Sequence, residues 1–183
     1  MKREERGVSM KSVTKKILDW VIIIVVAFAI NFVLRTFLIS NIVIPSPSMV
    51  PTINVGDRMF VSQIFNVDKL EYGDIIVFHP PVKGEEEKQY IKRFIGKEGD
   101  TIQVKDGALY RNGEKISEPY IAAKMEYEFG PVTIPKGKVF VMGDNRNDSY
   151  DSHLWDEPFL DKKEITGLAG FRFYPFNRMG IVK

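Results

Sequence analysis

Two serines lie in a proline-rich segment that could present a nucleophile. Ser46 and Ser48 alternate with Pro45 and Pro47, and Pro51 follows shortly after them. Because each proline fixes φ, the segment can form neither a helix nor a central strand and is expected to be a stiff loop. A stiff loop suits a nucleophile, because little freedom remains to be lost when the reacting atoms meet. The same composition is also typical of a linker between domains, so both interpretations stay open at this point.

A lysine in an apolar segment is the candidate base. If residues 90–96 form a strand, alternation places Lys92 on one face together with Tyr90 and Phe94. Burial on such a face disfavours the ammonium and lowers the pKa of the amine, which then becomes a base near neutral pH. The alternative is an edge strand, on which Lys92 and Arg93 would deter pairing with other chains.

The segment 143–153 is dense in acidic, amide and hydroxyl side chains and follows a predicted core strand. Such residues favour ordered turns, because their side chains form hydrogen bonds with nearby backbone. A calcium loop would use the acceptors Asp144, Asn145, Asp148 and Asp151, but the Asp-x-Asp-x-Asp-Gly spacing with a terminal Glu is missing. We therefore predict an ordered turn without a metal.

The composition excludes several classes of site. The 183-residue chain has no Cys and two His, which excludes disulfides, thiolate zinc sites and a Cys nucleophile, and argues against a multi-His metal centre. Residues 1–16 hold six Lys or Arg and two Glu, a net charge of +4, whereas the whole chain has +2, so the remainder is at −2. A nearly neutral body argues against nucleic-acid binding. We predict no cofactor, no metal and no nucleic-acid partner.

An apolar segment precedes all of these candidate residues. Residues 17–39 give 23 positions, enough at about 1.5 Å each for a helix to cross a hydrocarbon core of ~30 Å. Cations precede this segment, Trp20 lies near its start, and Arg35 can extend toward the far interface. The pattern predicts a single transmembrane helix with a cytoplasmic basic tail at 1–16.

This apolar segment has two alternative interpretations. A cleaved secretory signal has a similar basic start, and Ala27-Phe28-Ala29 has the small-x-small form of a cleavage site. That tripeptide lies inside the apolar run, however, which favours a retained anchor. A buried core helix is disfavoured because the run is apolar on all faces.

Residues 40–183 are predicted to form one extracytoplasmic all-β domain, so the fold class is mainly β behind one transmembrane helix. Short β-branched or aromatic runs separated by Gly, Pro and Asp are typical of strands. Asn112-Gly113 can supply positive φ at both positions of a tight turn, which predicts a subsidiary hairpin region at about 106–135. The predicted strands are Arg58–Ser62, Asp74–His79, Tyr90–Ile95, Thr101–Lys105, Lys138–Met142 and Gly167–Tyr174.

Four motifs follow the apolar segment in a fixed order. They are Ser48–Thr52, Gly73–Val77, Tyr90–Gly96 with Gly99-Asp100, and Gly143–Arg146 with Ser149, Asp151 and Ser152. With them the chain resembles the type I signal peptidases (leader peptidases), of the short single-anchor kind found in Gram-positive bacteria. The resemblance covers essentially the whole chain, and four motifs in order are far more specific than any one alone.

The resemblance implies a serine endopeptidase with a Ser–Lys dyad. Matched position by position, Ser48 corresponds to the nucleophile and Lys92 to the general base, which takes the hydroxyl proton and then protonates the leaving amine. The backbone N–H of Ser48 and the hydroxyl of Ser46 correspond to the oxyanion hole. Ser149 corresponds to the hydroxyl that orients the lysine.

The resemblance also assigns supporting residues and partners. Asp144, Arg146 and Asp151 correspond to residues that hold the geometry of the site. The implied substrates are signal peptides of exported preproteins, bound in extended form and cleaved after small residues at −1 and −3. The implied location is the cell membrane, where the chain crosses the lipid bilayer once, with the N-terminus cytoplasmic and the catalytic domain extracytoplasmic.

One position departs from the family pattern. His153 stands where the family usually has Arg after Asp151-Ser152, so a permanent charge is replaced by a group that is neutral above its ordinary pKa. Either the ion pair is dispensable, or activity becomes more sensitive to pH. The histidine also opens the alternative of a Ser48–His153–Asp144 triad, which the position of Lys92 in its own motif disfavours.

Two interpretations lie outside the family. A membrane-tethered β-domain that acts as a binding or scaffold module would need neither the hydroxyl nor the amine. A self-cleaving repressor with a Ser–Lys pair would carry a DNA-binding helix pair, and residues 1–40 contain neither its turn nor a basic recognition helix.

Overall fold

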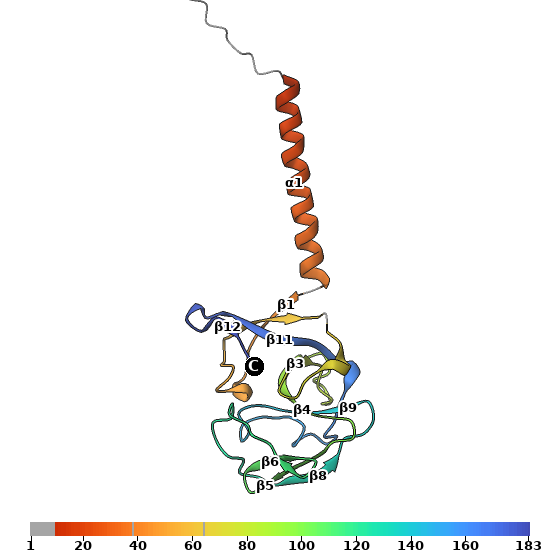
Figure 1. Ribbon diagram of the computed structural model, residues 1–183, viewed down its shortest axis with the longest axis vertical. Helices are drawn as coiled ribbons and strands as arrows, with labels where there is room; N and C mark the ends of the chain where they lie inside the picture. Colours follow the sequence, from red (N-terminus) through yellow and green to blue (C-terminus); the bar gives the residue numbers. More distant parts are fainter. Residues whose placement is uncertain (1–9, 38, 64) are drawn as a thin grey trace, which may run out of the picture. The chain divides into compact units, whose positions relative to one another are not determined.

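The computed structural model describes residues 10–37, 39–63 and 65–183, and on its N-terminal helix the side chains of residues 16–31. The chain divides into two compact units, residues 1–38 and residues 39–183 (Figure 1). Most of the predicted basic tail at 1–16 lies outside the described residues.

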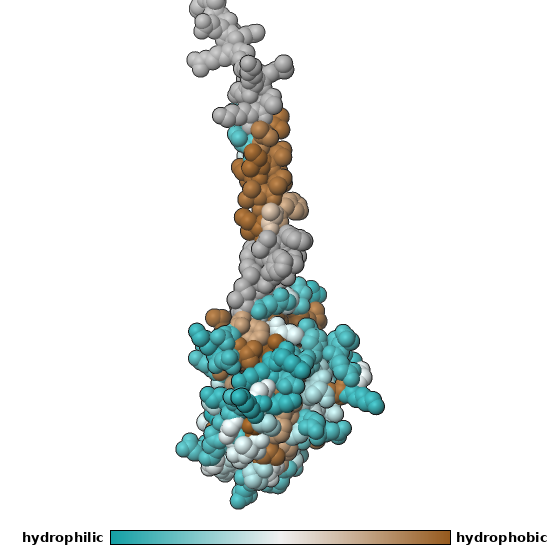
Figure 2. Space-filling view, turned by 90° about the vertical axis from the view of Figure 1, so that its right-hand side faces the viewer, coloured by the Kyte–Doolittle hydropathy of each residue, from teal (hydrophilic) through white to brown (hydrophobic). Residues whose placement is uncertain are grey.

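Helix α1 (Met10–Phe37) forms the first unit. Its sequence contains neither Gly nor Pro, the residues that most strongly destabilise a helix interior. All of its described side chains, at residues 16–31, are exposed, and most of them are apolar (Figure 2). Within the described part of the chain, no helix combines the length and the apolar character needed to cross a bilayer. The predicted span at 17–39 extends over residues 32–39, whose side chains lie outside the described set.

The second unit is built on a large antiparallel sheet of eight strands, so the predicted mainly-β character is confirmed. Its central strands are buried on both faces, which explains their continuous apolar runs. The strand order is β1 (Ile39–Val43), β2 (Arg58–Ser62), β11 (Ile165–Tyr174), β3 (Ile75–Phe78), β4 (Tyr90–Lys97), β9 (Lys138–Met142) and β10 (Leu160–Asp161), and β12 (Gly180–Ile181) pairs with β11. Short 3₁₀ helices lie between the strands: η1 (Pro47–Met49), η2 (Val67–Lys69), η3 (Lys162–Glu164) and η4 (Phe176–Arg178).

A smaller antiparallel sheet has the order β7 (Glu114–Lys115), β6 (Ala108–Arg111), β5 (Thr101–Lys105) and β8 (Phe129–Thr133). In Figure 1 its strands lie below β4 and β9. The predicted hairpin is present, with φ of 55° at Asn112 and 83° at Gly113, as a turn with two left-handed residues requires. The sheet also includes β5, so it starts earlier in the chain than the hairpin region predicted at about 106–135.

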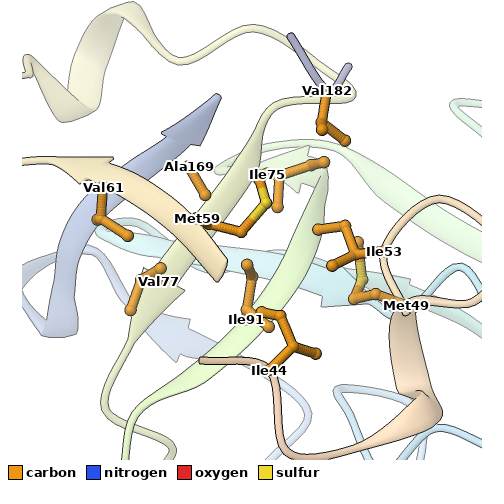
Figure 3. Close-up of a cluster of buried hydrophobic side chains, with 10 residues drawn as sticks. All are labelled: Ile44, Met49, Ile53, Met59, Val61, Ile75, Val77, Ile91, Ala169 and Val182. Atoms are coloured by element: carbon orange, nitrogen blue, oxygen red, sulfur yellow. The ribbon is translucent and has the colours of Figure 1, made fainter. Parts of the chain in front are cut away.

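One core cluster gathers side chains from the η1 loop and from strands of the large sheet (Figure 3). Burial of each such side chain stabilises the fold by roughly 1.5–3 kcal/mol. We call it the site cluster; its members are Ile44, Met49, Ile53, Met59, Val61, Ile75, Val77, Ile91, Ala169 and Val182. Two further clusters fill the rest of the unit, one around Phe94 and Trp155 and one between the two sheets around Ile102 and Phe140.

Candidate active site

The structure brings the two principal candidate residues together. Ser48 lies in η1, and Lys92 lies on β4, 44 residues further along the chain. Lys92 Nζ donates a hydrogen bond to Ser48 Oγ over 2.6 Å. Both residues are buried, with 6% of Ser48 and 4% of Lys92 exposed. An alcohol and an amine therefore face each other away from bulk water.

Apolar packing holds this pair in place. Met49 follows Ser48 directly, and Ile91 precedes Lys92, and both of these apolar side chains belong to the site cluster (Figure 3). The Pro47 ring favours the first turn of η1, and the N–H of Val50 closes that turn on the Pro47 carbonyl over 3.0 Å. The loop and the strand are thus fixed on the same core, and the distance between the two functional groups is set by packing.

Burial changes the acid–base character of the lysine. Loss of hydration lowers the pKa of Lys92 from 10.5 to about 8, and the charges of Asp151 and Asp144 oppose this effect only in part. The amine also lies 5.6 Å from the ring centroid of Tyr90, its neighbour on the same face of β4. The prediction of an aromatic, water-poor face around Lys92 agrees with this arrangement. A large fraction of the amine is neutral slightly above neutral pH, as a general base requires.

A pocket opens beside the pair. It has a volume of about 380 Å³ and is lined by Pro45, Ser46, Pro47, Ser48, Glu85, Lys88, Gln89, Tyr90, Ile91, Lys92, Asp148 and Tyr150. Ser46 Oγ lies 3.3 Å from Ser48 Oγ, so a second hydroxyl adjoins the candidate nucleophile. One wall is closed by Glu85, which accepts hydrogen bonds from the Tyr90 hydroxyl and from Lys88 Nζ.

The loop after β9 packs directly against the η1 loop. Pairing of Arg93 with Met142 places the start of this loop next to the strand of Lys92. The N–H of Asn145 donates to the Ser48 carbonyl over 3.0 Å. Gly143 fills the remaining space, because a Cβ built there would lie 2.3 Å from the Ser48 carbonyl oxygen and 2.2 Å from Ser149 Oγ. Only glycine permits this approach.

Asp144 is held by an arginine that the sequence analysis did not assign to the site. Arg93 donates from Nε to Asp144 Oδ1 over 2.7 Å and from Nη2 to Oδ2 over 2.6 Å, and its Nη1 donates to the Gly73 carbonyl. Thr52 adds a third hydrogen bond to this carboxylate. Arg93 is 1% exposed, so this is a buried, two-pronged ion pair. The motif Lys-Arg was visible in the sequence, but alternation suggested only that Arg93 faces away from Lys92.

Arg146 has a second unforeseen partner. Its Nη1 and Nη2 donate to the two oxygens of Glu118 over 2.7 and 2.5 Å, and its Nε donates to the Gly143 carbonyl over 2.9 Å. The Glu118 side chain is 3% exposed and comes from the segment between β7 and β8. Glu118 lies in a polar segment 28 residues before Arg146, and nothing in the sequence pattern indicates that the two side chains meet.

Asp151 collects hydrogen bonds from several groups. Its Oδ2 accepts from Ser149 Oγ over 2.5 Å and from the N–H of Gly143 over 2.8 Å, and His153 Nδ1 lies 2.7 Å from its Oδ1. Among the described residues, the partner of the Ser149 hydroxyl is thus this carboxylate. Gly143 lies between the Ser149 hydroxyl and the Ser48 carbonyl, and the charge of Asp151 acts on Lys92.

The predicted residues do not assemble into a histidine triad. His153 is bound to Asp151 and stacks on Tyr127, with ring centroids 4.1 Å apart and planes 7° apart. Asp144 is engaged by Arg93, and Ser48 by Lys92. Each member of the alternative Ser48–His153–Asp144 set therefore has a different partner. No group of three or more His, Asp or Glu side chains in the described part of the chain is arranged to hold a metal ion.

The arrangement can perform nucleophilic acyl chemistry. A neutral amine 2.6 Å from a buried hydroxyl can accept its proton, and a second hydroxyl, that of Ser46, lies 3.3 Å from the candidate nucleophile. Comparison with known proteins agrees with this class. The family model described as signal peptidase, peptidase S26, matches residues 17–174.

Several relatives cover most of the chain. A probable signal peptidase I-1 of Synechocystis sp. is 43% identical in an alignment of 164 positions, gaps included, that covers 86% of this chain and 83% of the relative. Signal peptidase I T of Bacillus subtilis is 40% identical in an alignment of 192 positions, gaps included, that covers 96% of this chain and 97% of the relative. A crystal structure of a signal peptidase I from Enterococcus faecalis covers 55% of this chain and 96% of that chain, with 31% identity and a TM-score of 0.48. The chain belongs to the signal peptidase family, peptidase S26.

Proposed function

We propose that this enzyme is a membrane-bound serine endopeptidase that removes N-terminal signal peptides from exported preproteins. Membership of the signal peptidase family supports the reaction. The observation that carries the catalytic assignment is the 2.6 Å contact between Lys92 Nζ and Ser48 Oγ inside a buried site.

In the proposed mechanism, Ser48 is the nucleophile and Lys92 is the general base. Neutral Lys92 takes the Ser48 proton as the oxygen attacks the scissile carbonyl, and the resulting ammonium protonates the leaving amine of the mature protein. Water then attacks the acyl-enzyme, again with the amine as base. The N–H of Ser48 and the hydroxyl of Ser46 stabilise the oxyanion, and loss of one such donor typically costs ~10²–10³ in rate.

The neighbouring polar residues have positioning roles in this proposal. Asp151, held by Ser149 and Gly143, sets the electrostatic environment of Lys92 and keeps the loop closed on η1. Asp144 ties that loop to the strand of Lys92 through Arg93, and Arg146 fixes its turn through Gly143. These residues do not touch the reacting atoms and act through the groups that do.

The pocket beside Ser48 is the proposed binding site for the C-terminal end of the signal peptide. Its wall of prolines, Tyr90 and Ile91 offers apolar surface for an extended chain, and the proposed preference is for small residues at −1 and −3. The mature protein is released with the leaving amine as its new N-terminus.

We further propose that residues 17–39 anchor the enzyme in the cell membrane. The support is helix α1, with its exposed apolar side chains, and the basic residues that precede it in the sequence. In this proposal, residues 1–16 are cytoplasmic and residues 40–183 form the extracytoplasmic catalytic domain.

The proposed chemistry is tested with the detergent-solubilised full-length chain and a preprotein that has small residues at −1 and −3. We expect the wild type to release the mature protein, and Ser48→Ala and Lys92→Met to lower kcat/KM at least about a thousandfold, because each removes one member of an interdependent pair. Lys105→Met and Ser117→Ala, at exposed positions, are the matched controls.

Two outcomes would contradict different parts of the proposal. Cleavage retained by both Ser48→Ala and Lys92→Met would exclude the dyad. No cleavage by the wild type would exclude the peptidase assignment and favour a tethered binding module.

A further inference from the structure

Two arginines beside the dyad share one tyrosine ring. Arg93 Cζ lies 3.9 Å from the ring centroid of Tyr120, and Arg146 Cζ lies 5.8 Å from it. The Tyr120 hydroxyl donates over 2.7 Å to Glu118 Oε1, and the same carboxylate receives two hydrogen bonds from Arg146. The segment that follows the hairpin therefore contacts both arginines at once.

Each arginine reaches the dyad by a short path. Arg93 is the neighbour of Lys92 on β4 and holds Asp144 through two hydrogen bonds. Arg146 donates to the carbonyl of Gly143, the residue that packs against the Ser48 carbonyl. A displacement of either guanidinium is thus transmitted to the strand of the base or to the loop of the nucleophile.

We propose that Glu118 and Tyr120 are positioning residues of the peptidase, which clamp the loop 143–146 against Ser48 and keep water away from the Lys92 amine. This inference rests on the proposed function. It assigns a role in the reaction to the segment between β7 and β8, to which the sequence motifs gave none.

The physical reason is the burial of like charges. Arg93 and Arg146 are 1% and 2% exposed, and two guanidinium groups this close to one ring repel each other. Asp144 and Glu118 neutralise one guanidinium each, and the negative face of the Tyr120 ring attracts both. Without that ring, one arginine is expected to move toward solvent and to open a path for water beside Gly143.

Water in this region would act on the base. The charged groups that act on Lys92 are Asp144 and Asp151 from the loop after β9, and the Tyr90 ring faces it from its own strand. Burial is the largest influence on this amine, so hydration moves its pKa upward toward 10.5. A variant with an opened clamp then needs a higher pH to reach the same fraction of neutral amine.

The experiment measures kcat, KM and the pH of half-maximal kcat for the full-length chain in detergent with the preprotein substrate. Tyr120→Met and Tyr120→Leu remove the aromatic face, and Tyr120→Phe removes only the hydroxyl. Tyr72 is the control from the same pocket, because it lines that pocket with Tyr120 and Arg93, but its ring lies 3.5 Å from Arg111 Cζ and its hydroxyl donates to Asp100. Tyr72→Met and Tyr72→Leu therefore break a similar stack and leave the contacts of Tyr120 with Arg93 and Arg146 in place.

We expect Tyr120→Met and Tyr120→Leu to lower kcat about tenfold with KM nearly unchanged, and to move the half-maximal pH upward. Tyr120→Phe is expected to stay close to the wild type, and the Tyr72 variants to leave the half-maximal pH in place. Two aliphatic variants are used so that the pH of half-maximal kcat can be measured on either one that folds. A loss of kcat without a pH shift, or the same shift in the Tyr72 variants, would overturn the clamp. Absence of cleavage by the wild type would instead count against the proposed function.

Discussion

Burial makes the charged form of the Lys92 amine costly for the folded protein. The decrease of its pKa from 10.5 to about 8 corresponds to about 3 kcal/mol at 1.36 kcal/mol per pH unit. Below about pH 8 the folded and unfolded chains both carry the charged form, so the full cost is present. Between about pH 8 and 10.5 the unfolded chain binds more protons, so stability rises with pH.

The change Lys92→Met is therefore predicted to stabilise the fold while abolishing catalysis. At pH 7 we expect the free energy of unfolding to rise by up to about 3 kcal/mol, and we expect this gain to shrink as the pH increases from 8 to 10. Chemical denaturation of both proteins across this pH range measures the difference. Lys105→Met, at an exposed strand end, is the control and should show no such pH dependence. A variant equally or less stable than the wild type at pH 7 would contradict the argument.

At the scale of elements, the loop after β9 meets the η1 loop through the backbone of Gly143 and Asn145. Gly143 has no left-handed φ that would demand glycine, so its requirement comes from the Ser48 carbonyl and the Ser149 hydroxyl alone. Rotation of a side chain cannot make room for a Cβ at Gly143, because the Ser48 carbonyl oxygen belongs to the main chain. The position of the η1 loop therefore depends directly on the position of the loop after β9.

We predict that Gly143→Ala lowers kcat about a hundredfold, because the added methyl group must push the Ser48 loop from its position. Gly170→Ala on β11 is the matched control, since a Cβ there meets no atom within 4 Å. Steady-state kinetics on the preprotein, with a thermal unfolding measurement for each variant, separates displacement of the site from loss of fold. Wild-type kcat in Gly143→Ala would show that the two loops do not need this contact.

The strands could be predicted where alternation or a buried apolar run is clear. The strands β2, β5 and β9 have the predicted bounds. The Asn112-Gly113 turn correctly predicted the hairpin of β6 and β7. The strand β1 was missed because its apolar residues continue the N-terminal run, and β8 because it contains Gly130-Pro131, a pair that argues against a strand. The strands β10 and β12 have two residues each, too few to show a period.

The site was predictable in its motifs but not in its partners. Ser48 and Lys92 could be found because family motifs name them. Arg93 and Glu118 could not, because their partners depend on strand register and on where a polar segment returns. The alternation of apolar and polar residues along a strand does not show which distant segments will contact it. A buried ion pair also has no local pattern in the sequence.

At the scale of the whole molecule, the proposed topology gives a test of its own. We expect a tag at the N-terminus to be protected when intact cells are treated with a protease, while residues 40–183 are digested. The reason is that cations flank the apolar segment on its N-terminal side, which favours retention of that side in the cytoplasm. Permeabilised cells are the control, in which the tag should be lost. An N-terminal tag that is digested in intact cells would contradict the single-pass orientation.

The sharing of one hydrophobic cluster by Met49 and Ile91 also has a consequence for timing. The Ser48 hydroxyl and the Lys92 amine lie 44 residues apart in the sequence, so their contact depends on the packing of that cluster. We therefore expect a newly made chain to lack peptidase activity until this cluster has packed. For the same reason, heating should abolish peptidase activity together with tertiary structure. No partly unfolded state should still cleave the preprotein.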